Sequence, residues 1–135
     1  MADPVTAVTD THPLVFHAAG GGRLGPRAAA LFDRCERREA TLYVPAAVIW
    51  ECGLIARAGR INLRRSVRAF FDDLFSNPAY QPLDLTPEQV LVADELSLTR
   101  DPFDALIVAT AVTMAMPLVT RDAVIRESGR VRVIW

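Results

Sequence analysis

The stretch DPFDALIVATAVTMAMPLVTRD, residues 101–122, decides the fold class of this chain. It opens with Asp101-Pro102, an N-cap residue followed by proline at the first helical position, and the long apolar run that follows predicts a helix over residues 102–115. Residues 118–120 then form a short apolar run that predicts a buried strand. A buried helix followed directly by a buried strand is typical of the βαβ units that build parallel sheets.

The remainder of the chain alternates between strands and helices in the same way. Apolar periodicity and the positions of proline and glycine predict strands over residues 5–9, 41–44, 80–85 and 131–135, helices over 26–39, 45–59, 63–75 and 87–98, and a helical turn over 12–18. This alternation favours a three-layer α/β/α fold, in which helices cover both faces of a mostly parallel central sheet. A length of 135 residues suits a single domain over residues 1–135.

The composition excludes several classes of protein. Hydrophobic residues make up 51% of the chain and charged residues 23%, which excludes a disordered or low-complexity chain. The net charge of −1 gives no overall basic field, so a polyanion must be held by a local group of cations. All 15 basic residues are arginine, and the absence of lysine excludes mechanisms that need a lysine base, a Schiff-base lysine or a P-loop lysine.

The cysteines and the N-terminus indicate a cytoplasmic protein. Cys35 and Cys52 lack the spacing of metal ligands, and two thiols make no disulfide framework, so we expect both to be reduced core residues. The N-terminus lacks the positively charged region of a signal peptide. The uncharged run over residues 105–120 is shorter than the ~20 residues that span a bilayer, so no membrane partner is expected.

Four carboxylates occupy positions that suggest a site. Asp10 follows the first strand and Asp122 follows the strand at 118–120, so both lie at carboxyl ends of strands, where parallel sheets bind ligands. Glu51 lies at the rim of an apolar helix face, and Asp104 opens a helix whose same-face neighbours are apolar. Each has a structural alternative, because aspartate also caps helices, stabilises turns and favours the helix dipole, and glutamate also pairs with arginine.

Taken together, these positions favour a metal site. All four carboxylates can converge on one edge of the sheet, where they would repel one another with no lysine to neutralise them. A hard divalent cation such as Mg²⁺ binds carboxylate oxygens together with substrate phosphate. Two such ions about 3.5–4 Å apart activate water and stabilise the leaving oxygen in phosphodiester hydrolysis. The pattern therefore predicts a metal-dependent nuclease.

Four segments carry a family resemblance: Val8-Thr9-Asp10-Thr11-His12, Ile49-Trp50-Glu51, DPFDALIVATA at residues 101–111 and PLVTRD at residues 117–122. In order, spacing and chain length they resemble the PIN-domain ribonucleases, and within these the VapC-type toxins of bacterial toxin–antitoxin pairs. The third and fourth segments together are highly specific. The chain departs from the family at Ala105, where many relatives carry arginine, and at His17, where the residue is often aromatic. These departures concern substrate preference.

The resemblance implies a PIN-like α/β fold, dependence on Mg²⁺ or Mn²⁺, cleavage of single-stranded RNA, a homodimer, and inhibition by a cognate antitoxin protein whose tail enters the acidic cleft. The family's acidic quartet, which binds metal and performs catalysis, is matched by Asp10, Glu51, Asp104 and Asp122. Thr120 matches the small hydroxyl residue beside the last aspartate, and Asp101 supports the site as the cap of the helix that carries Asp104.

Arginines form a second set of candidates, for RNA binding. Five of them lie close together in the sequence: Arg57, Arg60, Arg64, Arg65 and Arg68. Because guanidinium groups suit phosphate recognition, we predict that Arg64 and Arg65 contact RNA, with a solvated helix face as the alternative. Arg100 and Arg121 flank the site segments, so we expect them to contact substrate phosphate or to pair with the carboxylates.

A dinucleotide site and histidine catalysis are weaker interpretations. Gly20, Gly22 and Gly25 match the pattern G-x-G-x-x-G, but the acidic residue expected after the next strand is missing. General-base catalysis by His12 or His17 lacks a serine or cysteine nucleophile with a supporting pattern, so structural roles are expected for both.

Three other functions are alternatives to nuclease activity. A response-regulator receiver domain needs a lysine, which the chain lacks. A haloacid-dehalogenase-like phosphatase needs Asp-x-Asp after the first strand, where this chain has Asp10-Thr11-His12. The remaining alternative is a catalytically silent PIN-fold subunit that binds RNA or a partner protein.

Overall fold

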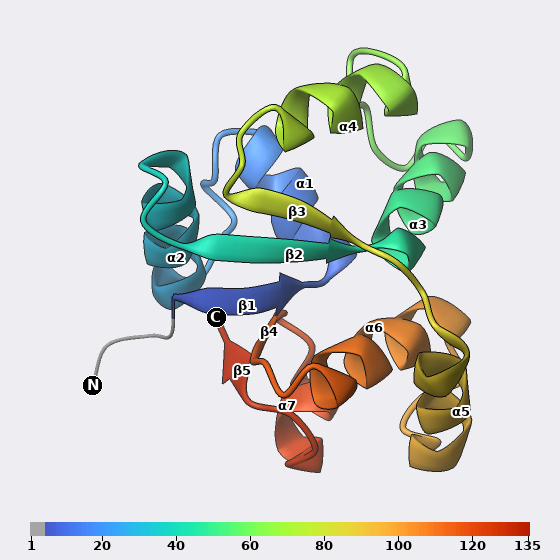
Figure 1. Cartoon of the computed structure of the whole chain (residues 1–135). Coiled ribbons are helices and arrows are strands. Elements are labelled where there is room, and N and C mark those ends of the chain that lie inside the picture. The colour runs from blue at the N-terminus through green and yellow to red at the C-terminus, as the bar shows by residue number, and fades with distance from the viewer. Residues whose placement is uncertain (1–4) are drawn as a thin grey trace.

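The computed structural model describes residues 5–135, and its centre is one sheet of five parallel strands (Figure 1). The strands are β1 (Thr6–Thr9), β2 (Thr41–Pro45), β3 (Tyr80–Leu83), β4 (Leu118–Val119) and β5 (Val133–Ile134). Their order in the sheet is β3-β2-β1-β4-β5, and every neighbouring pair is parallel. The chain builds outward from β1 in both directions, so the switch in strand order lies between β1 and β4, where parallel sheets bind their ligands.

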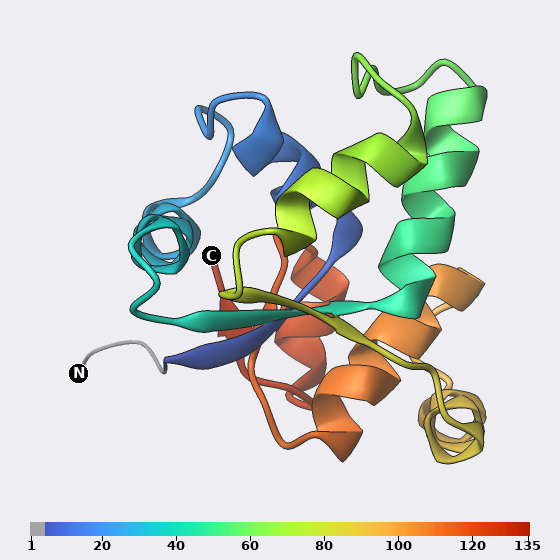
Figure 2. The same cartoon turned by 45° about the horizontal axis from the view of Figure 1, so that its top comes forward.

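Helices cover both faces of this sheet. They are α1 (Thr11–Ala18), α2 (Pro26–Glu36), α3 (Ala46–Arg57), α4 (Val67–Phe75), α5 (Pro87–Leu96), α6 (Pro102–Thr113) and α7 (Ala123–Ser128). Figure 2 views the sheet nearly edge on, with α1 and α4 above it and α5 and α6 below it. The three-layer α/β/α fold predicted from the sequence is therefore confirmed.

Strands β1 and β4, at the centre of the sheet, are almost completely buried. The side chains of Ala7 and Val8 in β1 and of Leu118 and Val119 in β4 are all 0% exposed. Burial on both faces explains why both inner positions of β1 and both positions of β4 are apolar, with no polar alternation there. No helix within residues 5–135 is long and apolar enough to cross a bilayer.

The two cysteines are free and buried, as the sequence predicted. Burial raises the pKa of Cys35 to about 12, with the neighbouring Glu36 adding to the shift. Burial likewise raises the pKa of Cys52 to about 12. Both side chains therefore stay protonated and act as small apolar core residues.

The prediction of a helix over residues 63–75 was wrong at its start. Helix α4 begins at Val67, because the Ser66 hydroxyl accepts a hydrogen bond from the Ala69 N–H (3.1 Å) and caps the helix. Just before it, Arg64 adopts a left-handed φ of 62°, which interrupts a helix. Most other predicted elements are present, with ends that differ by at most three residues.

Helix α7 was not predicted at all. It has six residues, too few for a helical periodicity to be visible in the sequence. It begins where the Asp122 side chain accepts a hydrogen bond from the Ile125 N–H (3.1 Å) and ends at Gly129, whose φ is 69°. Asp122 therefore lies between the end of β4 and the start of α7, and both elements fix the position of its backbone.

The glycine-rich segment does not form a dinucleotide-binding loop. It follows helix α1, where that motif requires a strand. Its last glycine, Gly25, packs against the C-terminal residue, and a Cβ atom there would lie 2.5 Å from the carbonyl oxygen of Trp135. The same oxygen accepts hydrogen bonds from the N–H groups of Arg27 (2.8 Å) and Ala28 (2.9 Å) in the first turn of α2. Gly25 therefore serves close backbone packing.

We expect Gly25→Ala to lower the free energy of unfolding by about 1–3 kcal/mol, because the added methyl group overpacks against backbone atoms that cannot move aside. Gly22→Ala is the matched control, since a Cβ atom at Gly22 meets nothing within 4 Å. Urea denaturation of both variants measures the difference. Equal stabilities would show that the contact with Trp135 is not constraining.

Candidate metal centre

The carboxyl ends of β1 and β4 meet at one edge of the sheet. Val8 is paired with Leu118 and Thr9 with Val119, so the two strands run in register to this edge. Asp10 follows β1 directly, and Asp122 follows β4 after two further residues. Both carboxylates therefore lie at the switch in strand order.

Asp10 is buried and held by neighbouring groups. It is 8% exposed, and its Oδ1 accepts a hydrogen bond from the Thr11 N–H (2.7 Å) at the start of α1. The Thr120 hydroxyl donates to Asp10 Oδ2 (2.8 Å) and accepts from the Asp122 N–H (3.1 Å). Burial raises the pKa of Asp10, while the hydrogen bonds from Thr120 and Thr11 act in the opposite direction. Asp10 is thus both a helix cap, as its structural alternative proposed, and a member of the cluster.

Glu51 reaches the same place from helix α3. Its Oε1 accepts a hydrogen bond from the hydroxyl of Thr11, a residue that is completely buried. Burial raises the pKa of Glu51, and the nearby Asp10 and Asp101 add to the shift. Arginine does not neutralise this side chain, since no arginine of residues 5–135 forms an ion pair with it.

Helix α6 contributes two carboxylates from its first turn. Asp101 caps the helix, and its Oδ1 accepts from the N–H groups of Phe103 (2.8 Å) and Asp104 (3.2 Å). Asp101, Asp104 and Glu51 each offer one carboxylate oxygen, and these oxygens all lie within 4.8 Å of one another. Burial first, and then repulsion by Asp10 and the other carboxylates, raises the pKa of Asp104 to about 7.

One cavity of about 460 Å³ joins these groups. The residues of the acidic quartet and its predicted supports all line it: Asp10, Glu51, Asp101, Asp104, Thr120 and Asp122. Three basic or titratable side chains, His12, Arg60 and Arg121, complete the polar part of its wall. The structure therefore brings together all six residues of the predicted centre and one of the four predicted RNA-binding arginines.

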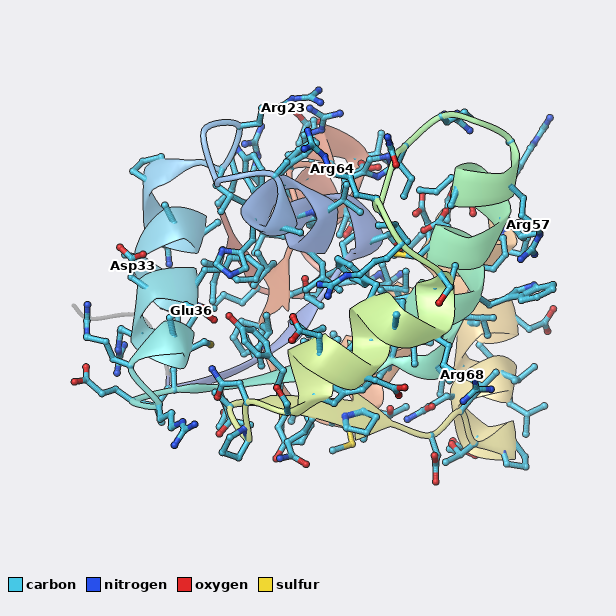
Figure 3. All side chains as sticks on the ribbon, turned by 90° about the horizontal axis from the view of Figure 1, so that it is seen from above. Arg23, Asp33, Glu36, Arg57, Arg64 and Arg68 are labelled. Atoms are coloured by element: carbon cyan, nitrogen blue, oxygen red, sulfur yellow. The ribbon has the colours of Figure 1, made fainter. Side chains whose placement is uncertain are left out.

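The other arginines lie elsewhere. Arg64 and Arg65 line a different cavity, between the end of α1 and the loop before α4, and Arg65 pairs with Asp73 (3.1 Å). Arg100 does not line the acidic cavity. Figure 3 shows Arg57, Arg64 and Arg68 well apart on α3, the loop and α4, so residues that are close in the sequence do not form one basic cluster. A role of Arg64, Arg65 and Arg100 in RNA binding stays a prediction.

Sequence reasoning did not assign Thr11, His12 or Arg60 to this centre, where Thr11 bonds Glu51 and the other two line the cavity. Thr11 and His12 directly follow Asp10 in the first turn of α1, and their nearness to Asp10 in the sequence is the signal that could have found them. Arg60 follows the end of α3, where the Arg60 N–H donates to the Ile55 carbonyl (3.0 Å) and Gly59 adopts a φ of 73°. The sequence signal for Arg60 is Gly59, which lies just past the end of the helix that carries Glu51 and allows the chain to turn there.

His17 has a structural environment, as expected. Its ring stacks on Phe32 with a centroid separation of 4.5 Å, and its Nε2 lies 3.3 Å from the Tyr80 hydroxyl. Tyr80 donates to Glu36 Oε2 (2.5 Å). This network lines a cavity that does not include the quartet.

We expect Thr120→Val to lower the free energy of unfolding by about 1–3 kcal/mol, because Asp10 Oδ2 loses its buried donor while the side-chain shape is kept. Thr110→Val is the control: Thr110 is 2% exposed, and its hydroxyl bonds only the Leu106 carbonyl (2.8 Å) of its own helix. Such a bond contributes little to stability. Urea denaturation compares the two, and equal losses would contradict a special role for Thr120.

With this geometry established, comparison with known proteins places the chain in a family. The family model of the PIN domain matches residues 7–130, a range that contains every carboxylate of the cavity. The chain belongs to the PIN domain family. No curated protein sequence matches it.

Solved structures share the fold of this PIN domain. VapBC2 from Rickettsia felis, bound to a promoter DNA fragment, is 14% identical, with a TM-score of 0.68 over 95% of this chain and 96% of that chain. DNA-bound VapBC from Salmonella typhimurium is 13% identical, with a TM-score of 0.65 over 98% and 97%. FitAcB from Neisseria gonorrhoeae is 18% identical, with a TM-score of 0.64 over 96% of each chain. At these identities the likeness establishes a common fold.

Proposed function

We propose that this PIN-domain protein is a metal-dependent endoribonuclease that hydrolyses phosphodiester bonds in single-stranded RNA. The observation that carries the proposal is the cavity at the carboxyl ends of β1 and β4, which gathers five carboxylates in a chain without lysine. Burial and mutual repulsion raise the pKa values of Asp10, Glu51 and Asp104 there. Such a cluster destabilises the fold unless a cation binds to it, which supports a metal centre.

The donor set fits Mg²⁺, with Mn²⁺ as the alternative, because hard divalent cations prefer carboxylate oxygens. We assign the ligands and catalytic residues to Asp10, Glu51, Asp104 and Asp122, with Asp101 and Thr120 in support. The closeness of the Glu51, Asp101 and Asp104 oxygens, all within 4.8 Å, supports this assignment. When bound, a divalent ion lowers the pKa of the attacking water and stabilises the leaving oxygen.

The protein's own residues hold this centre in place before RNA binds. Thr120 orients Asp10 and the backbone of Asp122, and Thr11 orients Glu51. In our proposal Asp10, Asp104 and Asp122 bind the metal, and Glu51 positions a second ion or the attacking water. Carboxylates fixed in this way need little rearrangement to reach the reactive geometry.

The chemistry we propose is in-line attack by water. A bond forms between the water oxygen and phosphorus, and the bond from phosphorus to the 3′ oxygen breaks. The products carry 5′-phosphate and 3′-hydroxyl ends. Ends with 2′,3′-cyclic phosphate would instead mean attack by the ribose 2′-hydroxyl and would contradict the proposal.

The test uses purified protein, free of any partner, with labelled cellular RNA in Mg²⁺ and in EDTA. Cleavage that requires the metal and leaves 5′-phosphate ends is the expected result. Cleavage that persists in EDTA would overturn metal dependence. Binding of Mn²⁺ without any cleavage would favour the second candidate, a catalytically silent subunit that binds RNA or protein.

We further propose that the protein is the VapC-type toxin of a toxin–antitoxin pair, acts as a homodimer and is inhibited by a cognate antitoxin. The fold likeness to VapBC and FitAcB structures supports this partner. Expression in bacteria is expected to arrest growth, and co-expression of the antitoxin to relieve the arrest. Light scattering is expected to give twice the mass of one chain, and a monomer would contradict the dimer.

A further inference from the structure

Two arginines stack on one phenylalanine beside the acidic cavity. The guanidinium carbon of Arg23 lies 4.3 Å from the ring centroid of Phe16, and that of Arg121 lies 4.9 Å from the same centroid. The two guanidinium groups can therefore be no farther apart than these two distances taken together. Phe16 is 4% exposed, so its ring is a fixed platform, whereas both arginines are exposed.

The glycine-rich segment brings Arg23 to this platform. Helix α1 ends in a Schellman motif, in which the Gly20 N–H donates to the His17 carbonyl (3.1 Å) and the Gly21 N–H donates to the Phe16 carbonyl (2.8 Å). Gly20 and Gly21 adopt φ values of 105° and 80°, which residues with a Cβ rarely reach. The chain then turns back over α1, since the Leu24 N–H donates to the Gly21 carbonyl (3.1 Å). This turn accounts for the glycines that a dinucleotide site did not explain.

Arg121 reaches the platform from the metal centre. It lies between Thr120, which bonds Asp10, and Asp122, and it lines the acidic cavity. The arginine pair and the carboxylates therefore belong to one continuous surface. Figure 3 shows Arg23 on the loop after α1, well away from Arg57 and Arg68.

Neither guanidinium group is neutralised. Within residues 5–135, no carboxylate forms an ion pair with Arg23 or Arg121. Contact through the ring face holds a guanidinium group while its N–H edges stay free to donate. Two guanidinium groups that share one ring, with no described carboxylate paired to either, favour an anion with several acceptor oxygens, and phosphate matches the fork of N–H donors.

We propose that Arg23 and Arg121, anchored on Phe16, form a phosphate clamp that binds the backbone of single-stranded RNA next to the acidic cavity. The clamp rests on the proposed function, in that it would present the neighbouring phosphodiester bond to the metal centre. Each arginine binds one of two neighbouring phosphates of a single strand, and the clamp reads no base. The negative cavity alone repels RNA, so a cationic contact beside it is needed to hold the strand.

The test is a salt titration of RNA binding. Fluorescence anisotropy follows a labelled single-stranded RNA of mixed sequence on protein carrying Asp104→Asn, which is expected to slow cleavage about 100-fold or more, so that the RNA lasts through the titration. Adding Arg23→Gln and Arg121→Gln is expected to weaken binding about 10–100-fold, because charge-assisted hydrogen bonds are lost. The slope of log affinity against log salt is expected to become shallower by about 1.4, at about 0.7 for each phosphate contact on a single strand.

The matched control is Arg130→Gln with Arg132→Gln on the same background. Both arginines are exposed and line a separate cavity with Ala111 and Met116. Their replacement changes the net charge by the same amount as replacement of Arg23 and Arg121. The control is expected to keep the slope of the reference protein. If both pairs change affinity and slope equally, or if the reference protein does not bind the RNA, the clamp is overturned.

Cleavage of the same RNA by the wild-type protein in Mg²⁺ separates the two proposals. If the wild type does not cleave the RNA, but the Arg23 and Arg121 variant binds it more weakly and with a shallower salt dependence, the clamp stands and the nuclease proposal fails. If the wild type cleaves and the variant matches its control, only the clamp fails.

Discussion

Asp104→Asn is expected to reduce RNA cleavage by about 100-fold or more, because changes even in groups that only orient metal ligands lower activity about 10–100-fold. Asparagine has the same shape as aspartate, so the Asp101 cap and the start of α6 are expected to remain. The variant loses one negative oxygen from the group that also contains Glu51 and Asp101. Initial rates of cleavage in Mg²⁺ and the binding constant for Mn²⁺ measure the effect.

Asp72→Asn serves as the control for Asp104→Asn. Asp72 is exposed on α4 and lies outside the acidic cavity, and the substitution changes the charge by the same amount. We expect its cleavage rate to stay close to that of the wild type. If Asp104→Asn cleaves RNA as fast as Asp72→Asn, the assignment of Asp104 to the metal centre is wrong.

The carboxylates of the centre were predictable because local rules place them. Asp10 and Asp122 come just after short β-prone segments with apolar centres, and parallel neighbours carry their carboxyl ends to one edge. Asp101-Pro102 marks a helix start, which fixes Asp104 in the first turn. Each of these signals spans a few residues of sequence, so no knowledge of distant packing is needed to read it.

The arginines were not predictable in the same way. The loop before α4 turns at Arg64, whose φ is 62° and whose N–H donates to the Asn62 side chain (2.8 Å), and this separates Arg64 from its neighbours in sequence. Arg23 reaches Phe16 only because the glycines after α1 reverse the chain. Long side chains on loops are positioned by tertiary contacts, and a periodic pattern does not encode them.

The metal-free protein is expected to lose stability as pH rises from about 4 to about 7. Burial, followed by repulsion from Asp10, Asp101 and Glu51, raises the pKa of Asp104 to about 7 in the folded state. In the unfolded chain the same carboxyl titrates near its ordinary value of about 3.9. The folded state thus binds this proton more tightly than the unfolded state does. The resulting stabilisation is complete below the pKa of the unfolded chain and is lost as the pH rises through the pKa of the folded protein.

Asp104→Asn isolates this effect, because the amide stays neutral at every pH. In EDTA at about pH 8, we expect the variant to be more stable than the wild type by about 2 kcal/mol, a value reduced for screening of a half-buried carboxyl. At about pH 4, where the wild-type carboxyl is protonated, the two are expected to unfold at similar temperatures. Thermal unfolding followed by circular dichroism across this pH range gives the comparison.

Divalent metal is expected to stabilise the folded protein, whereas deprotonation of Asp104 without metal destabilises it. Mg²⁺ binds the folded state, so it raises the Tm of the wild type, and it raises that of Asp104→Asn less because a ligand is missing. The substitution that destroys cleavage should therefore stabilise the metal-free protein and weaken its response to metal. A variant that is less stable than the wild type at about pH 8 in EDTA would mean that Asp104 is held by favourable contacts rather than by a cation, and the centre would then be structural.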